Sequence, residues 1–254
     1  MGYSGCSLPL APLSPAVKAQ REYEVKFEVY QRVQSAAKNV HAKLGKFINS
    51  ESTECTIVKV AVELLAKEGI SDTWYHNVPA LVLLGSRSCI SISGRNYQPS
   101  DERVGETNLV TVDLSPMLGS VWGDCARSYF IEHGKYVSNP GRKEFHEGKS
   151  VEIELHSAMK EFVTPGTLFS ELYEFGNRQI NVKGFVNLDF LGNLGHSIET
   201  SPVQRRFIDK NCNETLGSVR FFTFEPHIKK KGCNWGFKHE NIYYFNESGR
   251  AVEL

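Results

Sequence analysis

The chain has 254 residues, 41% of them hydrophobic, and its 29 Lys and Arg residues balance its 29 Asp and Glu residues. The composition lacks the basic excess of most nucleic-acid-binding proteins. The six cysteines form no Cys-x-x-Cys pair, which argues against a disulfide framework or a zinc ribbon, and no apolar run is long enough to span a bilayer. We therefore expect a cytoplasmic protein with neither nucleic-acid nor membrane partners.

In chain order, a loose arm rich in Ser, Pro and Gly is predicted over residues 1–15, followed by a single domain over 16–254. Apolar residues at three- and four-residue steps from Tyr23 to Leu44 predict a long amphipathic helix. A second helix is expected to begin after Thr53, a candidate cap, and to end at Gly69.

Short strands and two more helices are expected after this point. Strand-like segments punctuated by Pro and Gly cover residues 74–76, 81–84, 88–92, 109–114 and 121–131. Helices over 143–162 and 167–180 then precede strands over 218–224, 233–237, 242–245 and 251–252, and the basic run 229–231 is predicted to form a solvated turn. Because helix, loop, helix and strands occur twice, we expect two related halves around one sheet, with helices on its outer face.

Five polar residues are placed where they require an explanation. Asp113 and Asp124 each interrupt an apolar strand, and a turn containing glycine separates them. A buried carboxylate is tolerated when it is paired, protonated or bound to a cation. His196 follows a glycine in a loop, Glu225 ends an apolar strand, and Glu240 begins another.

Together these side chains have the chemistry of a metal centre. Four carboxylates carry about four negative charges at neutral pH, which two divalent cations would neutralise. Oxygen ligands with one imidazole suit Mn, Fe, Co or Zn. Two such ions would activate a bridging water and hold a substrate atom.

Five short motifs carry a family resemblance: "VDLSP", "GDCARSYF", "GHSIE", "FFTFEPHI" and "GFKHENIYYF". In this order the chain resembles the metallopeptidases that include methionine aminopeptidase, Xaa-Pro aminopeptidase, prolidase and creatinase. The resemblance covers nearly the whole chain, from about residue 16. It implies an α+β pita-bread fold, in which helices cover a curved, mainly antiparallel sheet with pseudo-twofold symmetry. It implies the single-domain form, because the extra N-terminal domain of prolidases and creatinases has no room here.

The resemblance also implies a role for each of the five residues. Asp113 would bind one metal ion, His196 and Glu225 would bind the other, and Asp124 and Glu240 would bridge the two. Glu225 would also be the base that takes the proton from the attacking water.

Two histidines that usually line the substrate site of this family are missing. The segment 96–101 upstream of Asp113 contains none, and "GHSIETSPVQRR" has none after His196. His76 and His227 are the candidates to replace them as catalytic residues. Tyr97 and Gln98 occupy the upstream position, and a contact with substrate is a further hypothesis for them.

The sequence leaves three functions open. The first is a metal-dependent hydrolase of C–N bonds, which acts on a peptide or on a specialised small-molecule amide. The second is a non-catalytic binding module on the same fold, and the third is a di-iron enzyme that activates oxygen. Homodimerisation is common among relatives, but no feature of the sequence requires it.

Overall fold

The computed structural model describes residues 15–254, and the side chains of residues 15–23 and 25 are outside the description. The predicted arm therefore lies outside the described residues except for Pro15, where the first helix begins. Helices α1 (Pro15–Leu44) and α2 (Glu54–Lys67) confirm the first two predicted helices. Thr53 caps α2, because its hydroxyl accepts from the Thr56 amide while the Thr56 hydroxyl accepts from the Thr53 amide. None of the helices within residues 15–254 has the length and apolarity needed to cross a membrane.

The strands of the first half form two small antiparallel sheets. One has the order β2-β3-β6-β7 and the other β1-β4-β5. Their bounds are β1 Asp72–Thr73, β2 Ala80–Leu84, β3 Asn108–Leu114, β4 Pro116–Leu118, β5 Val121–Trp122, β6 Cys125–Glu132 and β7 Lys135–Val137. The strand predicted over 88–92 was wrong, because a 3-10 helix (Gly85–Cys89) begins that segment. The strand predicted over 121–131 is broken at Gly123 and Asp124, which frees that aspartate from the strand ladder.

The second half repeats the plan with helices α3 (Lys143–Phe162) and α4 (Phe169–Val182). Its sheets have the orders β11-β10-β8 and β13-β12-β9, again antiparallel. The strands are β8 Phe185–Asn187, β9 Phe222–Phe224, β10 His227–Lys230, β11 Gly236–Lys238, β12 Asn241–Phe245 and β13 Ala251–Glu253. The predicted solvated turn at 229–231 was wrong for its first two residues, since Lys229 and Lys230 belong to β10 and the turn begins at Lys231.

Each half buries one histidine in the same way. In the first half, His41 of α1 hydrogen-bonds to the hydroxyl of Tyr129 (2.8 Å) and to the carbonyl of Cys125, four residues earlier (2.9 Å). In the second half, His156 of α3 contacts the hydroxyl of Tyr243 (2.6 Å) and the carbonyl four residues before it (3.0 Å). The two halves are therefore related in their interior contacts as well as in their element order, as expected for the pita-bread fold.

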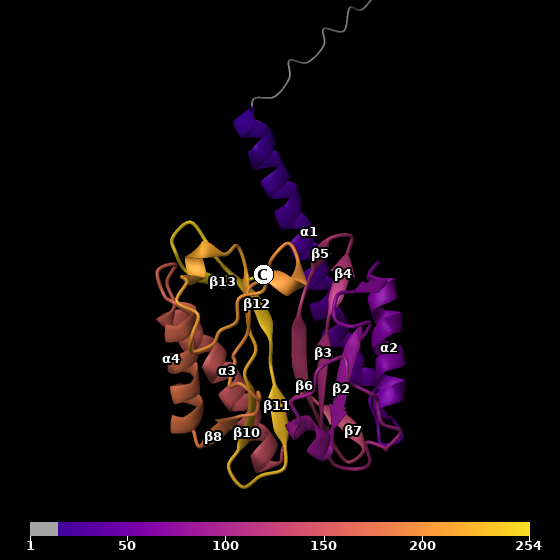
Figure 1. Cartoon of the computed structure of the whole chain (residues 1–254). Coiled ribbons are helices and arrows are strands. Elements are labelled where there is room, and N and C mark those ends of the chain that lie inside the picture. Colours follow the sequence, from indigo (N-terminus) through magenta and orange to yellow (C-terminus); the bar gives the residue numbers. More distant parts are fainter. Residues whose placement is uncertain (1–14) are drawn as a thin grey trace, which may run out of the picture.

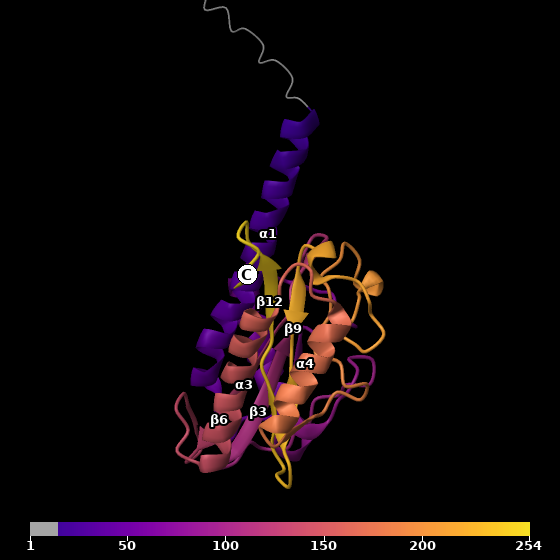
Figure 2. The same ribbon diagram turned by 90° about the vertical axis from the view of Figure 1, so that its left-hand side faces the viewer.

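The strands of the two halves run side by side through the middle of the molecule. Figure 1 shows β3 and β6 next to β11 and β12, with α3 and α4 on one side and α2 on the other. In Figure 2, α1 and α3 lie on one side of these strands, and the loops between β8 and β9 lie on the opposite side. A bridge between Ala126 and Glu240 joins the halves, so residues from both meet at the centre of the fold.

Candidate metal centre

Asp113 and Asp124 are positioned by the first half. Asp113 lies near the end of β3, opposite Ala126 of β6, and Asp124 immediately precedes β6. The main chain of Asp124 is held by Gln34 of α1, whose amide donates to the Asp124 carbonyl (2.8 Å) and whose carbonyl accepts from the Asp124 amide (3.3 Å). Because Gln34 is fully buried, this contact fixes the aspartate against the longest helix.

His196 is positioned by a close approach of two backbones. Gly195 has φ +139°, and a Cβ there would lie 2.4 Å from the carbonyl oxygen of Thr223. Only glycine therefore lets this segment pack beside β9, where the His196 amide donates to the Thr223 hydroxyl (3.0 Å). The imidazole Nδ1 donates to the carbonyl of Ser197 (3.1 Å), an assignment that leaves Nε2 as an acceptor. His196 thus presents the lone pair that a metal ligand needs.

Glu225 and Glu240 come from the ends of strands in the second half. Glu225 follows β9 with its amide bonded to the carbonyl of Leu194 (2.9 Å), and Glu240 donates its amide to the carbonyl of Ala126 (3.0 Å). The side chain of Glu240 is fully buried, and neither of its carboxylate oxygens has a hydrogen-bond partner among the described residues. A carboxylate buried without partners is costly, so Glu240 requires a cation or a proton.

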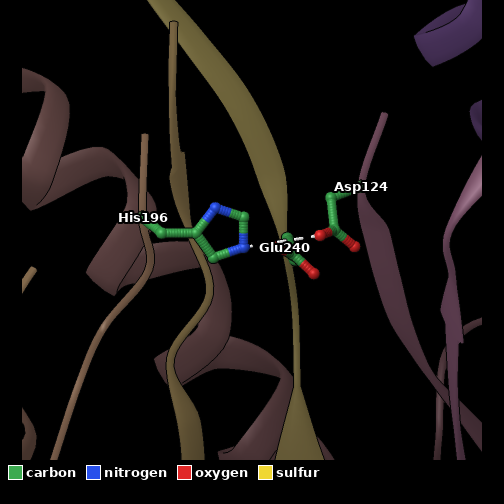
Figure 3. Close-up of side chains that lie close together, drawn as sticks. All are labelled: Asp124, His196 and Glu240. Atoms are coloured by element: carbon green, nitrogen blue, oxygen red, sulfur yellow. Dashed lines mark ion pairs between the residues drawn. The ribbon is translucent and has the colours of Figure 1, made fainter. Parts of the chain in front are cut away.

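Three of the five predicted ligands converge on one point. Asp124, His196 and Glu240 each offer a ligand atom, and these atoms lie within 4.8 Å of one another. Figure 3 shows the three side chains pointing toward one another from separate segments. The Nε2 of His196 is 3.5 Å from Asp124 Oδ2 and 3.8 Å from Glu225 Oε1, which puts Glu225 at the edge of the same cluster. A divalent cation fits here, because two buried carboxylates and a neutral imidazole supply both its charge and its ligands.

The other two predicted ligands lie around a lysine that the sequence analysis did not identify. The ammonium of Lys238 is 2.5 Å from Asp113 Oδ2 and 3.0 Å from Glu225 Oε2, and it is 4.0 Å from Glu240 Oε2. Lys238 lies two residues before Glu240. Strand alternation places both side chains on one face, and this signal was available in the sequence.

The pKa values of the acids follow from this crowding. Burial raises the pKa of Asp113 to about 7; Lys238 opposes the rise, while Asp124 and Glu225 add to it. Burial also raises the pKa of Glu240 well above its usual range, with the charges of Asp124 and Glu225 adding to the effect. Burial acts to raise the pKa of Glu225 too, but Lys238 and His196 outweigh it and the pKa is lowered. Asp113 and Glu240 therefore need more positive charge nearby than Lys238 supplies if they are to ionise at their usual pKa.

The cluster lies at a pocket of about 450 Å³, large enough for a small organic substrate. Its wall includes Asp113, Asp124, His196, Glu225 and Lys238. Exposed apolar side chains border it, among them Ile90, Phe190, Leu191 and Phe207. The pocket therefore combines ionised groups with apolar surface.

Both candidate histidines lie on the wall of this pocket. His76 is exposed, in a loop with φ +50°, and its ring packs on Tyr75. His227 is buried on β10, and its Nε2 donates to the carbonyl of Ser88 (2.6 Å). That bond leaves only Nδ1 of His227 as an acceptor, and burial lowers its pKa to about 4. Both histidines remain predicted catalytic residues.

The hypothesis that Tyr97 and Gln98 contact the substrate was wrong. The hydroxyl of Tyr97 accepts from the amide of Val82 (3.0 Å) and donates to its carbonyl (3.1 Å), and neither Tyr97 nor Gln98 lines the pocket. Arg95, close by in the sequence, does line it. Phe207 pairs with His196 across a β-bridge, with 6.0 Å between ring centroids.

A second cationic residue escaped the sequence analysis. Arg205 lies over the rings of Trp74 (4.7 Å) and Phe207 (5.4 Å), and all three border the pocket. Its Nε donates to the carbonyl of Pro202 (2.7 Å). Among the described residues no carboxylate pairs with its terminal nitrogens, so these donors remain available at the pocket. No local motif marks this arginine, since only packing brings it to Trp74.

The family follows from the match of the chain to a family model. Residues 28–247 match the model described as metallopeptidase family M24. The chain belongs to metallopeptidase family M24. Membership identifies the Asp124, His196 and Glu240 cluster as a candidate site for the metal of an M24 protein.

Solved structures show the same pita-bread fold. An X-Pro aminopeptidase from Thermotoga maritima MSB8 matches with TM-score 0.75 and 19% identity over 91% of this chain and 60% of its own. A prolidase from Pyrococcus furiosus matches with TM-score 0.72 and 18% identity over 90% and 63%. A methionine aminopeptidase from Thermotoga maritima matches with TM-score 0.70 and 15% identity over 87% and 93%. The M24 chain thus spans about three-fifths of the first two proteins and most of the third, and no curated protein matches it by sequence.

Proposed function

We propose that the chain hydrolyses a C–N bond of a peptide or small-molecule amide, using water and a divalent metal held by Asp124, His196 and Glu240. The observation that carries the proposal is the buried carboxylate of Glu240, which has no hydrogen-bond partner among the described residues and faces the other two ligands beside a pocket. Mn, Fe, Co or Zn suits this donor set. In its full five-ligand form, the prediction adds Glu225 as a ligand beside His196 and Asp113 as a ligand of a second ion.

The chain's own residues supply the remaining chemistry. A bound divalent cation would lower the pKa of water and polarise the scissile carbonyl. Glu225 is the proposed base, because it lines the pocket, lies 3.8 Å from the imidazole of His196, and has a lowered pKa that keeps its carboxylate ionised and able to accept a proton at neutral pH. The indoles of Trp74 and Trp122 pack together with their centroids 4.6 Å apart, and both lie on the same side of that imidazole, at centroid distances of 6.1 and 5.8 Å.

The pocket also indicates the kind of substrate. Arg205 presents terminal guanidinium donors, and planar N–H pairs suit a carboxylate. The apolar border suits a hydrocarbon side chain. We therefore extend the proposal to an amide with a free carboxylate close to the scissile bond, such as a dipeptide or an N-acyl amino acid.

The predicted cytoplasmic location and homodimerisation stay predictions.

The test compares the native chain with Glu225→Gln after loading with Mn²⁺, Co²⁺, Zn²⁺ or Fe²⁺. Hydrolysis of a panel of dipeptides and N-acyl amino acids by the native chain, abolished by a chelator, is expected. In Glu225→Gln, kcat should fall by roughly 10²–10⁴-fold while the metal stays bound, because a base and not a required ligand is lost. Metal uptake without hydrolysis of any panel member would favour the non-catalytic binding module. Oxygen consumption by the iron-loaded chain would favour the di-iron enzyme that activates oxygen.

A further inference from the structure

Lys238 contacts carboxylates from three parts of the chain. Its ammonium lies 2.5 Å from Asp113 at the end of β3, 3.0 Å from Glu225 after β9, and 4.0 Å from Glu240 before β12. The lysine side chain is only 18% exposed, so water screens these contacts little. One protein cation therefore lies inside the carboxylate cluster.

The ammonium lies where the ion assigned to Asp113 would have to lie. That ion needs carboxylate oxygens of Asp113 and Glu240 at about 2.0–2.2 Å. The Asp113 oxygen instead accepts a 2.5 Å bond from Lys238, whose charge would repel a nearby cation. Among the described residues, the one group of three or more ligands close enough for an ion is Asp124, His196 and Glu240, and it does not include Asp113.

The charges balance with a single ion. Four carboxylates carry about four negative charges, which two divalent ions would neutralise. One divalent ion, the ammonium of Lys238 and the guanidinium of Arg205 at the pocket wall supply the same positive charge. The imidazole of His196, with Nδ1 bonded to a carbonyl, adds none as a neutral ligand.

We infer that Lys238 takes the place of the second metal ion, so that the centre holds one divalent cation on Asp124, His196 and Glu240. Glu225 lies between the two groups: its Oε1 faces His196, a ligand of that ion, and its Oε2 pairs with Lys238. Asp113 is then the lysine's partner and not a metal ligand. This inference rests on the proposed function for the metal itself, but it concerns the number of ions and not the reaction.

The test is a count of bound ions in metal-stripped protein titrated with Mn²⁺ alone, by calorimetry and by elemental analysis after dialysis. The native chain is expected to bind about one ion, Lys238→Met about two, and Lys238→Arg, which keeps the charge, about one. The electron paramagnetic resonance spectrum of Mn²⁺ gives an independent readout, because a pair of neighbouring ions is magnetically coupled and a single ion is not.

A second variant keeps the inference falsifiable if Lys238→Met does not fold, as judged by circular dichroism. Asp113→Asn should still bind about one ion, since Asp113 is not a ligand of that ion. Two ions in the native chain, one ion in a folded Lys238→Met, or loss of the ion in Asp113→Asn would each overturn the inference. If the native chain bound no Mn²⁺, both the proposed function and this inference would be wrong.

Discussion

The two halves of the molecule bury equivalent histidines but place side chains of opposite charge, Asp124 and Lys238, at equivalent positions near the centre. His41 bonds to the carbonyl of the residue after Asp124, and His156 bonds to the carbonyl of the residue after Lys238. Asp124 and Lys238 are therefore equivalent positions in the two halves, and so are Ala126 and Glu240, which pair across the junction. The backbones of the two halves place equivalent residues at equivalent positions near the centre. The type of residue at each position then decides whether it can bind a metal ion.

The difference teaches how an asymmetric site arises on related halves. The first half supplies two aspartates, whereas the second supplies two glutamates, an imidazole and an ammonium. On one side of the cluster three ligands face one another, and on the other side Lys238 joins Asp113 to Glu225. Because the two halves share their backbone arrangement, substituting the residues that each half contributes to the cluster tests directly how the halves differ.

The largest effect is expected from Glu240→Gln, which removes the negative charge that distinguishes Glu240 from its equivalent, Ala126. Metal affinity should fall by more than the ~10–100-fold typical of losing an outer hydrogen-bond partner, and hydrolysis should fall with it. The metal-free variant should be more stable than the metal-free native chain at neutral pH, because burial and the neighbouring acids, which raise the pKa of Glu240 well above its usual range, oppose its ionisation. Calorimetry and thermal unfolding with and without Mn²⁺ measure both effects.

The control for this variant is Glu214→Gln, a change to an exposed glutamate of the same half that pairs with Arg206. It should leave metal binding unaltered. If Glu240→Gln bound Mn²⁺ as tightly as this control, Glu240 would not be a ligand.

A smaller effect is expected from Arg205→Met, since Arg205 is a guanidinium that the second half adds to the pocket wall. A hydrogen bond to a charged group contributes about 1.5–3 kcal/mol, so KM for substrates with a free carboxylate should rise by roughly 10–150-fold. Substrates whose carboxylate is replaced by a carboxamide should be nearly unaffected. An equal loss for both kinds of substrate would show that Arg205 supports the pocket through its rings and does not recognise the carboxylate.

The smallest effect concerns stability, where the halves should behave alike. Burial lowers the pKa of both His41 and His156 to about 3, with Arg127 contributing to each. Below about pH 6.5 the unfolded chain binds protons that the folded chain rejects, so the free energy of unfolding should decrease as the pH falls toward 3. Each histidine contributes a slope of up to about 1.4 kcal/mol per pH unit.

His41→Gln and His156→Gln should each remove its share of that slope, measured by urea unfolding between about pH 7.5 and pH 5. At neutral pH His156→Gln should also lose about 1–3 kcal/mol, because the buried Tyr243 hydroxyl loses its bond to the imidazole. The loss in His41→Gln should be smaller, because the Tyr129 hydroxyl still donates to the main-chain carbonyl of residue 41. A change of slope in only one variant would contradict the equivalence of the two histidines.

The sequence by itself determined the fold class, the family and the residue types of the metal centre. These features are local: apolar periodicity specifies helices and strands, and an acid inside an apolar strand is conspicuous wherever the strand later packs. The long helices were predicted nearly to their ends. The short strands β1, β4, β7, β8 and β10 were missed, because two to four residues pair only where a neighbouring strand offers partners. The strand predicted over 74–76 was wrong, because those residues form a bend and a turn after β1.

Only the tertiary structure decided which of the five predicted ligands share one point. Distances between Asp113, Glu225 and Lys238 depend on how strands from both halves align, and a one-residue change of register would turn these side chains to the other face. The same holds for Arg205, which borders the pocket because Trp74 and Phe207 pack beneath it. The sequence gives the type of each residue. The charges near each acid, however, come from residues that are remote in sequence and are brought close only by the tertiary structure.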